Sequence, residues 1–465
     1  MHTARLSHRP ELLRVSRAQP SGPKRLSAIR RELGTGQSTC QFGRRALHLM
    51  AFVAVITLCA ATLTGCPNDP SQSTCKEDPC PWGMSCDDAS EQCRAPNRVK
   101  ARSISSRPAI VTNADGVVYV SAYDTEGRDL VLGVWDRVDG RLNYQTVDSN
   151  RDVGLYSAID LYSDGRPAIA YRDSSLARLM FAYMDEGGQW RTEVIDDTAD
   201  VGVDLDLTID SEDVPHVSYR DRTYQVLRYA LRSQEIWRFD FVDTGADPPS
   251  QIPVEEACPE EQRSRVNRGV GYQSHLVVSG ATPVVSYYDA DCGTLRLARK
   301  SGGSWVLRVI DGASDPLPSQ NPGTRVGHYN DIAIDAKGDP VVAFFDGGEG
   351  TLKIARSLDG VPLIELIDDG RRRDETGERK IIVGQFPSIA FDTDGSAVIS
   401  HINGATLGLL LSTRSPTGWK TSSLDIEPGV IATALAIGSD GTRHVVTQEI
   451  GGEHTLVRLD HISRN

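Results

Sequence analysis

The sequence predicts an all-β protein built from seven four-stranded repeats, and three observations support this prediction. The first is composition: 42 Gly and 24 Pro among 465 residues suit a chain that is rich in turns. The second is a segment of about 45–57 residues that recurs along the chain after residue 100. The third is that apolar and polar residues alternate with a period of two inside each copy, which is typical of strands.

The repeats can be followed from a Val-Gly pair that opens five of the copies. These pairs lie at Val153-Gly154, Val201-Gly202, Val270-Gly271, Val326-Gly327 and Val383-Gly384. Partial copies flank them at about residues 106–148 and 430–465, which makes seven copies. Seven successive copies of one unit favour a repeat architecture over a pair of unrelated β-sandwiches.

Each copy reads as four short strands in a fixed order. The first strand alternates, as Ile159 and Leu161 do, and a turn such as Asp164-Gly165 follows it, which suits the positive φ of a tight hairpin. The second strand ends in an aromatic residue and an Asp, the third carries Leu and Ala, and the fourth often opens with Trp. We expect the carboxylates that end the second strands to accept loop N–H groups: Asp124, Asp173, Asp221, Asp289 and Asp346.

Four strands per repeat of this length is the sequence signature of a β-propeller blade. The repeats resemble those of bacterial lipoprotein propellers in the broad sialidase-like, or BNR-type, group, and the resemblance covers roughly residues 99–465. It implies the fold and is weak evidence for function. A solenoid is the rival architecture. Because the last copy supplies only three strands, we expect the alternating stretch 99–104 to pair with its final strand and close the ring.

The first 65 residues read as an N-terminal extension and a lipoprotein signal peptide. Arg44 and Arg45 precede an apolar run of about 15 residues, which is short for a membrane span and typical of an export signal. The run ends in Leu-Thr-Gly-Cys at 63–66, which resembles the lipobox of bacterial lipoproteins. This resemblance implies a lipid on Cys66 and anchoring to the cell envelope, in the outer membrane of a Gram-negative bacterium. A plain signal peptide or a single anchor helix is the alternative.

Residues 66–97 form a short Cys-rich neck before the propeller at 98–465. This neck carries four cysteines besides Cys66 within a stretch too short for a hydrophobic core: Cys75, Cys80, Cys86 and Cys93. An exported chain favours two disulfides among them, with three possible connectivities. A four-Cys zinc site is the alternative, but the paired C-x-x-C knuckles of such sites are missing.

One insertion, residues 245–268, separates the third and fourth of the seven copies and carries Cys258. Cys292 lies in a hairpin of the next repeat. These are the only two cysteines of the propeller, and both are expected on loops, so the sequence predicts a disulfide between them.

Charge narrows the choice of partners. The chain has a net charge of −13, but residues 1–65 hold ten Lys and Arg against two Glu, so the remainder carries −21. Such a body repels phosphate backbones, and we expect no nucleic-acid partner. The expected partners are the membrane, through the lipid anchor, and a protein or carbohydrate ligand. We expect no cofactor.

Sialidases need an arginine cluster, and the aligned residues Arg172 and Arg220 could meet an anion in neighbouring repeats. Residues that recur in a repeat more often serve the repeat itself. The turns also lack the spacing and the Trp of the Asp-boxes that sialidases carry. No P-loop, GxSxG, HExxH or complete EF-hand loop is present either, so no catalytic residue is predicted.

Function tends to reside where the copies differ. Four residues after the Val-Gly pair, three consecutive repeats carry Asp206, His275 and Asp331 near the start of the expected innermost strand. Two carboxylates and an imidazole could hold a divalent ion or a polar ligand. Hydrogen bonding of each side chain to neighbouring backbone is the simpler explanation.

Two positions earlier the repeats carry mostly aromatic residues that could form the floor of a sugar- or peptide-binding site: Tyr156, Gln273, Tyr329 and Phe386. Packing between blades explains them equally well. The sequence therefore predicts a cell-envelope lipoprotein whose propeller binds or scaffolds an unidentified ligand. A glycosidase- or lyase-type enzyme acting at the channel mouth is the alternative.

Overall fold

The computed structural model describes the short strands at 85–87, 92–94 and 99–100, and then residues 108–459 apart from six gaps. The gaps are 137–140, 246–268, 313–325, 375–376, 425–428 and 451–453. The chain divides into two compact units, Met1–Gly65 and Cys66–Asn465, and every described residue belongs to the second. The predicted export signal, the lipid site Cys66 and the cysteines Cys75, Cys80 and Cys258 lie outside the described residues.

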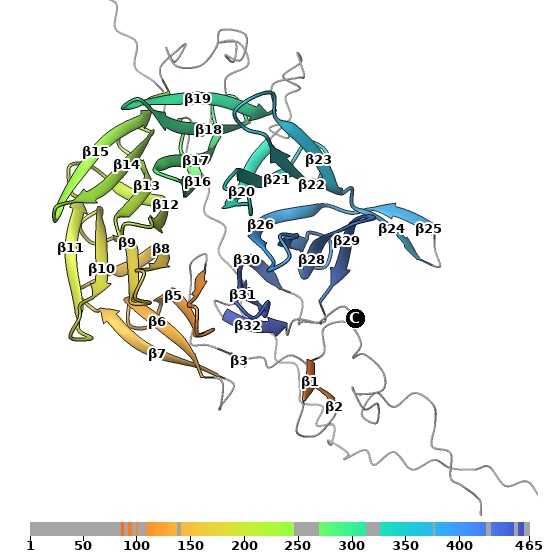
Figure 1. The fold of residues 1–465 in the computed structure, drawn as a ribbon, viewed down its shortest axis with the longest axis horizontal. Coiled ribbons are helices and arrows are strands. Elements are labelled where there is room, and N and C mark those ends of the chain that lie inside the picture. The colour runs from red at the N-terminus through yellow and green to blue at the C-terminus, as the bar shows by residue number, and fades with distance from the viewer. Residues whose placement is uncertain are drawn as a thin grey trace, which may run out of the picture. The chain divides into compact units, whose positions relative to one another are not determined.

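Every element assigned within the described residues is a strand, so the all-β prediction is confirmed. None of these residues belongs to a helix that could cross a membrane. Seven four-stranded antiparallel sheets, here sheets 1 to 7, follow one another along this part of the chain (Figure 1).

The first three sheets have continuous up-and-down connections. Sheet 1 contains β4 (Ala109–Thr112), β5 (Val118–Asp124), β6 (Asp129–Asp136) and β7 (Arg141–Asp148). Sheet 2 contains β8 (Val153–Leu161), β9 (Pro167–Asp173), β10 (Arg178–Met184) and β11 (Trp190–Asp196). Sheet 3 contains β12 (Val201–Ile209), β13 (Pro215–Asp221), β14 (Val226–Ser233) and β15 (Ile236–Asp243).

The next three sheets repeat this order. Sheet 4 contains β16 (Tyr272–Ser279), β17 (Thr282–Asp289), β18 (Thr294–Ser301) and β19 (Ser304–Asp311). Sheet 5 contains β20 (Val326–Ile334), β21 (Pro340–Asp346), β22 (Thr351–Arg356) and β23 (Leu363–Asp368). Sheet 6 contains β26 (Val383–Phe391), β27 (Ala397–Asn403), β28 (Gly408–Ser415) and β29 (Gly418–Ser423).

Sheet 7 joins the two ends of the repeat region. It contains β30 (Val430–Ile437), β31 (Arg443–Glu449), β32 (His454–Leu459) and, from before the first repeat, β3 (Val99–Lys100). Val99 pairs with Leu456 and Lys100 with Thr455. The predicted closure by an N-terminal strand is therefore confirmed, although the paired strand covers two residues of the expected 99–104.

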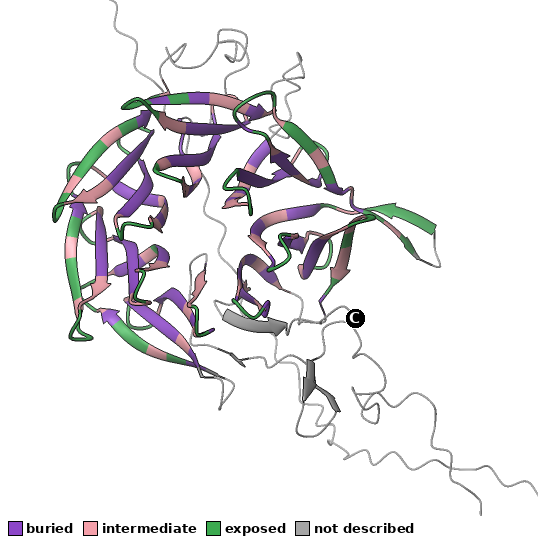
Figure 2. Cartoon of the chain, in the orientation of Figure 1, coloured by how far each residue is buried: buried purple, intermediate pink, exposed green. Residues whose placement is uncertain are grey.

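The first strands of the sheets face one another at the centre, and the fourth strands lie outside (Figure 1). Each first strand contacts the first strands of both neighbouring sheets, and β30 of sheet 7 contacts β4 of sheet 1. Burial follows this order, because the middle strands are largely buried and the outer strands are largely exposed (Figure 2). Four-stranded sheets arranged in this way are the blades of a β-propeller.

A Tyr–Asp hydrogen bond connects several neighbouring sheets. A buried Tyr on the second strand donates its hydroxyl to the Asp that ends the fourth strand of the preceding sheet. The pairs are Tyr171 with Asp148 (2.6 Å), Tyr219 with Asp196 (2.7 Å) and Tyr287 with Asp243 (2.7 Å). We call these pairs the Tyr–Asp latches. They satisfy polar groups that would otherwise be costly to bury.

The Val-Gly pairs are explained by the close approach of neighbouring sheets. Gly154, Gly202 and Gly384 have positive φ values, and each lies against the third strand of the preceding sheet. A Cβ on Gly154 would lie 2.8 Å from the Cα of Leu130, and one on Gly384 would lie 2.8 Å from the Cα of Leu352. Only glycine fits both the backbone conformation and the available space.

The carboxylates that end the second strands accept loop N–H groups, as predicted. Asp173, for example, accepts hydrogen bonds from the N–H groups of Ser175 (3.0 Å) and Leu176 (3.1 Å). Asp221 does the same for Thr223 and Tyr224. These residues therefore shape the hairpin turns.

Two features concern the cysteines. In the neck, β1 (Ser85–Asp87) and β2 (Gln92–Arg94) form a two-stranded sheet whose register places Cys86 opposite Cys93. Cys292 is disulfide-bonded. Its predicted partner, Cys258, lies outside the described residues, so this pairing and those of the neck stay predictions.

A second two-stranded sheet was not foreseen from the sequence. It is formed by β24 (Arg371–Asp374) and β25 (Gly377–Lys380), between sheets 5 and 6. Arg372 fixes its base by donating two hydrogen bonds, of 2.9 and 2.6 Å, to the carboxylate of Asp368.

Candidate functional site

The first strands share a kink two residues after the Val-Gly pair. The pairing of the first strand with the second shifts register at this point in sheets 2, 3, 4 and 6. In all four sheets the same non-glycine position has a left-handed φ: Tyr156 (53°), Asp204 (48°), Gln273 (49°) and Phe386 (49°). This conformation costs an L-residue roughly 1–2 kcal/mol. The bend therefore recurs at an energetic cost, while its side chain differs from sheet to sheet.

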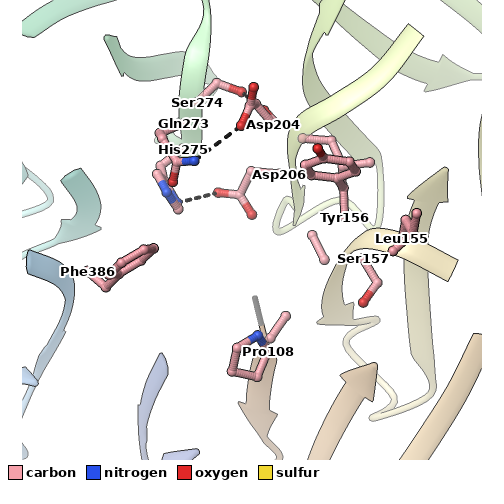
Figure 3. Close-up of a pocket in the computed structure, with 13 residues that line it drawn as sticks. Pro108, Leu155, Tyr156, Ser157, Asp204, Asp206, Gln273, Ser274, His275 and Phe386 are labelled. Carbon is pink, nitrogen blue, oxygen red and sulfur yellow. Dashed lines mark hydrogen bonds and ion pairs between the residues drawn. The ribbon is translucent and has the colours of Figure 1, made fainter. Parts of the chain in front are cut away.

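These four residues line one cavity of about 330 Å³, which we call the mouth cavity. Its wall comes from the first strands of sheets 1, 2, 3, 4 and 6, together with Pro108, which precedes β4. In Figure 3, Tyr156 and Phe386 lie on opposite sides of the cavity, and Asp204, Asp206 and His275 form a polar third side. A cavity of this size is at the lower end of the range for small-molecule sites.

The structure brings the predicted trio of Asp206, His275 and Asp331 together. The Nδ1 atom of His275 lies 3.6 Å from Oδ2 of Asp206 and 3.2 Å from Oδ1 of Asp331. Asp206 and His275 line the mouth cavity, whereas Asp331 is not among its lining residues. The three side chains meet around the imidazole, and only two of them face the cavity.

The carboxylates of Asp206 and Asp331 also accept hydrogen bonds from backbone N–H groups. Asp206 accepts the N–H groups of Leu207 (2.9 Å) and Leu276 (2.8 Å), and Leu276 belongs to the next sheet. Asp331 accepts the N–H groups of Ile332 (3.0 Å) and Ile389 (2.9 Å), the second again in the next sheet. The simpler explanation offered by the sequence, hydrogen bonding to neighbouring backbone, therefore holds. These carboxylates connect the first strand of one sheet to the first strand of the next, and we call this contact the strand clip. Among the described residues, no group of three or more His, Cys, Asp or Glu is placed to bind a metal ion.

Other side chains form a strand clip between other pairs of sheets. Asp160 accepts the N–H group of Ile209 in the next sheet at 2.7 Å, and Ser388 accepts that of Leu435 at 3.1 Å. Burial raises the pKa of Asp160 to about 6, against the opposing effect of its two backbone donors. Burial, together with the negative charge of Asp204, likewise raises the pKa of Tyr156.

The two aligned arginines do not form an anion site. Arg172 donates to the carbonyl oxygen of Val201 and to Asp200 (2.6 Å). Arg220 donates to the carbonyl oxygen of Val270 (3.2 Å) and to the hydroxyl of Tyr272 (2.9 Å). Both arginines are buried and bind the first strand of the next sheet, so they serve the repeat.

Of the aromatic residues predicted at this position, Tyr156 and Phe386 line the mouth cavity and Tyr329 does not. Tyr156 is 44% exposed at the mouth cavity. Phe386 also lines the cavity and packs against Tyr329, with ring centroids 4.0 Å apart. Tyr329 in turn contacts His328, with ring centroids 4.5 Å apart, and is not among the residues that line the cavity. Phe386 therefore belongs to a series of packed rings that includes residues outside the cavity lining.

Sequence reasoning overlooked Asp204. It occupies the same repeat position as Tyr156 and Phe386, and its Oδ1 accepts a hydrogen bond from Nε2 of Gln273 at 3.2 Å. The repeat alignment alone could have found it, because the position was recognised in four other copies. Pro108 was missed because it precedes a partial copy that lacks the Val-Gly pair.

No family profile and no curated protein matches this sequence. Similar solved structures include a fungal alcohol oxidase in complex with copper (11% identity, 78% of this chain and 75% of that chain, TM-score 0.48). Others are the six-bladed β-propeller lectin of Aleuria aurantia (13% identity, 69% and 95%, TM-score 0.41) and a Hadza microbial sialidase (10% identity, 74% and 73%, TM-score 0.41). The structural neighbours are thus β-propeller proteins that include lectins and a sialidase. At these identities they indicate nothing about the ligand of this chain.

Proposed function

We propose that this chain is an exported lipoprotein, anchored through Cys66, whose seven-bladed β-propeller binds a ligand in the mouth cavity. Sheets 1 to 7 are the seven blades of this proposal. The neck at 66–97 connects the lipid to the propeller, and the expected location is the outer membrane of a Gram-negative bacterium.

The observation that carries the binding role is the set of four left-handed residues around one cavity. Strained backbone persists only where the surrounding structure imposes it, and it clusters at ligand sites. Here the backbone is constant while the side chains are Tyr, Asp, Gln and Phe. A rigid frame that presents different side chains to one cavity suits recognition of a ligand.

A glycosidase or lyase is the second candidate, because two carboxylates, Asp204 and Asp206, line the same cavity. Glycosidases use such a pair as acid and as base or nucleophile. Against this, both oxygens of Asp206 already accept backbone N–H groups. A carboxylate held in this way is poorly placed to exchange a proton with a substrate, so binding without catalysis is favoured.

Thermal-shift measurements on the purified full chain test the binding role. The panel would contain mono- and disaccharides, short peptides, amino acids and amines. We expect at least one class to raise the melting temperature, and Tyr156→Ala with Phe386→Ala to abolish the shift. Phe239→Ala with Phe241→Ala is the matched control, because these exposed rings lie on the outer strand β15. Ligand shifts that survive in the mouth variant would contradict the proposed site.

Hydrolysis of chromogenic glycosides by the same preparation decides between binding and catalysis. We expect no turnover above that of an Asp204→Asn, Asp206→Asn variant. Turnover that is lost in this variant would establish the enzyme instead.

The lipid anchor has its own test. Cys66→Ser is expected to leave an unprocessed precursor, since the modified thiol is what allows cleavage in lipoproteins that share this box. Maturation of the variant to the normal size, with detergent partitioning retained, would refute the assignment. Non-reducing peptide mapping checks the Cys258–Cys292 bond and the two neck bonds.

A further inference from the structure

We infer that the mouth cavity takes an organic cation, an ammonium or substituted ammonium group held between Tyr156 and Phe386 and facing Asp204 and Asp206. This inference rests on the proposed function and names the chemical class of its ligand.

The charge of the cavity is the first argument. Of the 13 residues that line it, two are carboxylates and one is His275, and none of these described lining residues is Lys or Arg. Two like charges 4 Å apart repel by about 4 kcal/mol at an effective dielectric constant of about 20. A phosphate, a sulfate or a sugar acid would therefore be repelled, whereas a cation would be attracted.

The arginines close to Tyr156 do not cancel the negative charge of the cavity. Arg172, Arg220 and Arg222 each act to lower the pKa of Tyr156, against the larger effect of burial. Two of them share one acceptor, since Arg172 lies 2.6 Å and Arg222 3.5 Å from the carboxylate of Asp200. Arg220 is committed to a carbonyl oxygen and to the hydroxyl of Tyr272. None of these three arginines is among the residues that line the cavity.

The aromatic walls are the second argument. Tyr156 and Phe386 lie on opposite sides of the cavity, and Asp206 lies along the side between them (Figure 3). Phe386 is held in place by Tyr329, whose ring centroid is 4.0 Å away. A cation within about 6 Å of an aromatic ring gains about 0.5–2 kcal/mol, and more when water is excluded. Carboxylates combined with aromatic walls therefore favour an organic cation over a neutral ligand.

Isothermal titration of the full chain with choline tests the inference. The matched probe is 3,3-dimethyl-1-butanol, which has the same shape and hydroxyl group but carries no charge. We expect choline to bind about tenfold more tightly than this analogue, which is the effect of one moderate cation–π or charge interaction. The affinity for choline should fall as NaCl is added, because the attraction is screened.

Two variants locate the interaction. Asp204→Asn keeps the acceptor for Gln273 but removes the charge, and Phe386→Leu removes a ring while keeping an apolar side chain. Each should weaken choline binding about tenfold without moving the melting temperature of the free protein by more than a few degrees. Phe241→Leu, an exposed ring on β15, is the control and should leave binding unchanged.

Three results would overturn the inference: no binding of choline, tetramethylammonium or ethylammonium; equal binding of the neutral analogue; or equal binding in both variants. If a neutral sugar from the panel then binds in a way that depends on Tyr156 and Phe386, the proposed function stands and only the cation assignment fails. If no panel compound depends on these residues, both fail.

Discussion

The Tyr–Asp latches and the left-handed residues that line the mouth cavity both recur from sheet to sheet, yet they follow opposite rules. At the latches the residue is repeated: Tyr171, Tyr219 and Tyr287 each donate to an Asp of the preceding sheet. At the mouth the backbone is repeated while the side chain changes. The contrast separates two uses of an internal repeat, because constant residues maintain packing and constant backbone with variable residues is available for recognition.

Four of the seven described sheets lack the latch Tyr: the position is occupied by Ala122, Phe344, His401 and Thr447 in sheets 1, 5, 6 and 7. Two of these four sharpen the comparison. Phe344 occupies the latch position in sheet 5, and His401 occupies it in sheet 6. Both side chains are fully buried. The corresponding acceptors, Asp311 and Asp368, are present in the preceding sheets. Substitutions at latches and at the mouth should therefore give effects that differ in size and in kind.

The largest effect is expected from removal of a latch acceptor. Asp243 is buried and accepts hydrogen bonds from Tyr287 (2.7 Å) and Arg296 (2.9 Å). Asp243→Ala leaves a buried guanidinium and a buried hydroxyl without this partner, so we expect a loss of about 3–5 kcal/mol in the free energy of unfolding. Urea denaturation measures the change.

The matched control is an exposed ion pair. Asp359 lies 3.1 Å from Arg299 and its side chain is 68% exposed. Asp359→Ala should cost less than about 1 kcal/mol, because solvent screens such pairs. Equal losses for the two variants would mean that the latch contributes no more than a surface pair.

The second effect depends on pH and concerns His401. Burial lowers the pKa of His401 to about 4, whereas an unfolded histidine has a pKa near 6.5. Between these values the unfolded chain binds a proton that the folded chain does not, so stability falls as the pH drops from about 6.5 to about 4. The loss over this window is about 3 kcal/mol.

His401→Tyr removes this titration and restores the residue of the other latches. We expect the difference in unfolding free energy between variant and parent to grow steadily as the pH is lowered through the same window. Denaturation at a series of pH values provides the measurement. A difference that does not change with pH would show that His401 is not a source of acid lability.

Much of this molecule could be predicted from its sequence, because the residues that build a blade act locally. Period-two alternation, Asp-Gly turns and Val-Gly pairs each report a backbone requirement that a reader can recognise. The proximity of Asp206, His275 and Asp331 also followed from the alignment of the copies, since equal positions in successive blades lie side by side.

The rest depended on information that leaves no local trace. A left-handed φ at Tyr156 or Asp204 is imposed by neighbouring sheets, and such residues do not favour that conformation on their own. The sequence therefore could not show that these side chains face one cavity. The β24–β25 hairpin was missed for a similar reason: its charged residues carry no alternation of apolar and polar positions.

A gain of stability is expected where the latch residue is missing. The Oδ2 atom of Asp311 is buried and lies 3.6 Å from Nζ of Lys353, which is too long for a good hydrogen bond. Phe344→Tyr places a hydroxyl at the position from which the other latches donate. We expect a gain of about 1 kcal/mol, seen as a higher urea midpoint. A lower midpoint would show that sheet 5 has no room for the hydroxyl.

The smallest effect on stability is expected at the mouth, and there its sign is informative. Tyr156 has a φ of 53°, so Tyr156→Gly should be more stable than Tyr156→Ala by about 1 kcal/mol, because an alanine still pays for the left-handed conformation. The next residue provides the control. Ser157 is not among the residues with positive φ, and its hydroxyl accepts a hydrogen bond from Ser121 that either replacement removes. At this position the order should reverse, with Ser157→Ala the more stable variant, because glycine weakens a regular strand. Urea denaturation of the four variants measures both differences.

Both Tyr156 variants should also lose ligand binding, which separates the mouth from the latches. At the latches a large loss of stability is expected, whereas at the mouth a loss of binding with little change in stability is expected. The same order of Gly and Ala at both positions would mean that the kink at residue 156 is not imposed by the fold, and the comparison between the two regions would lose its basis.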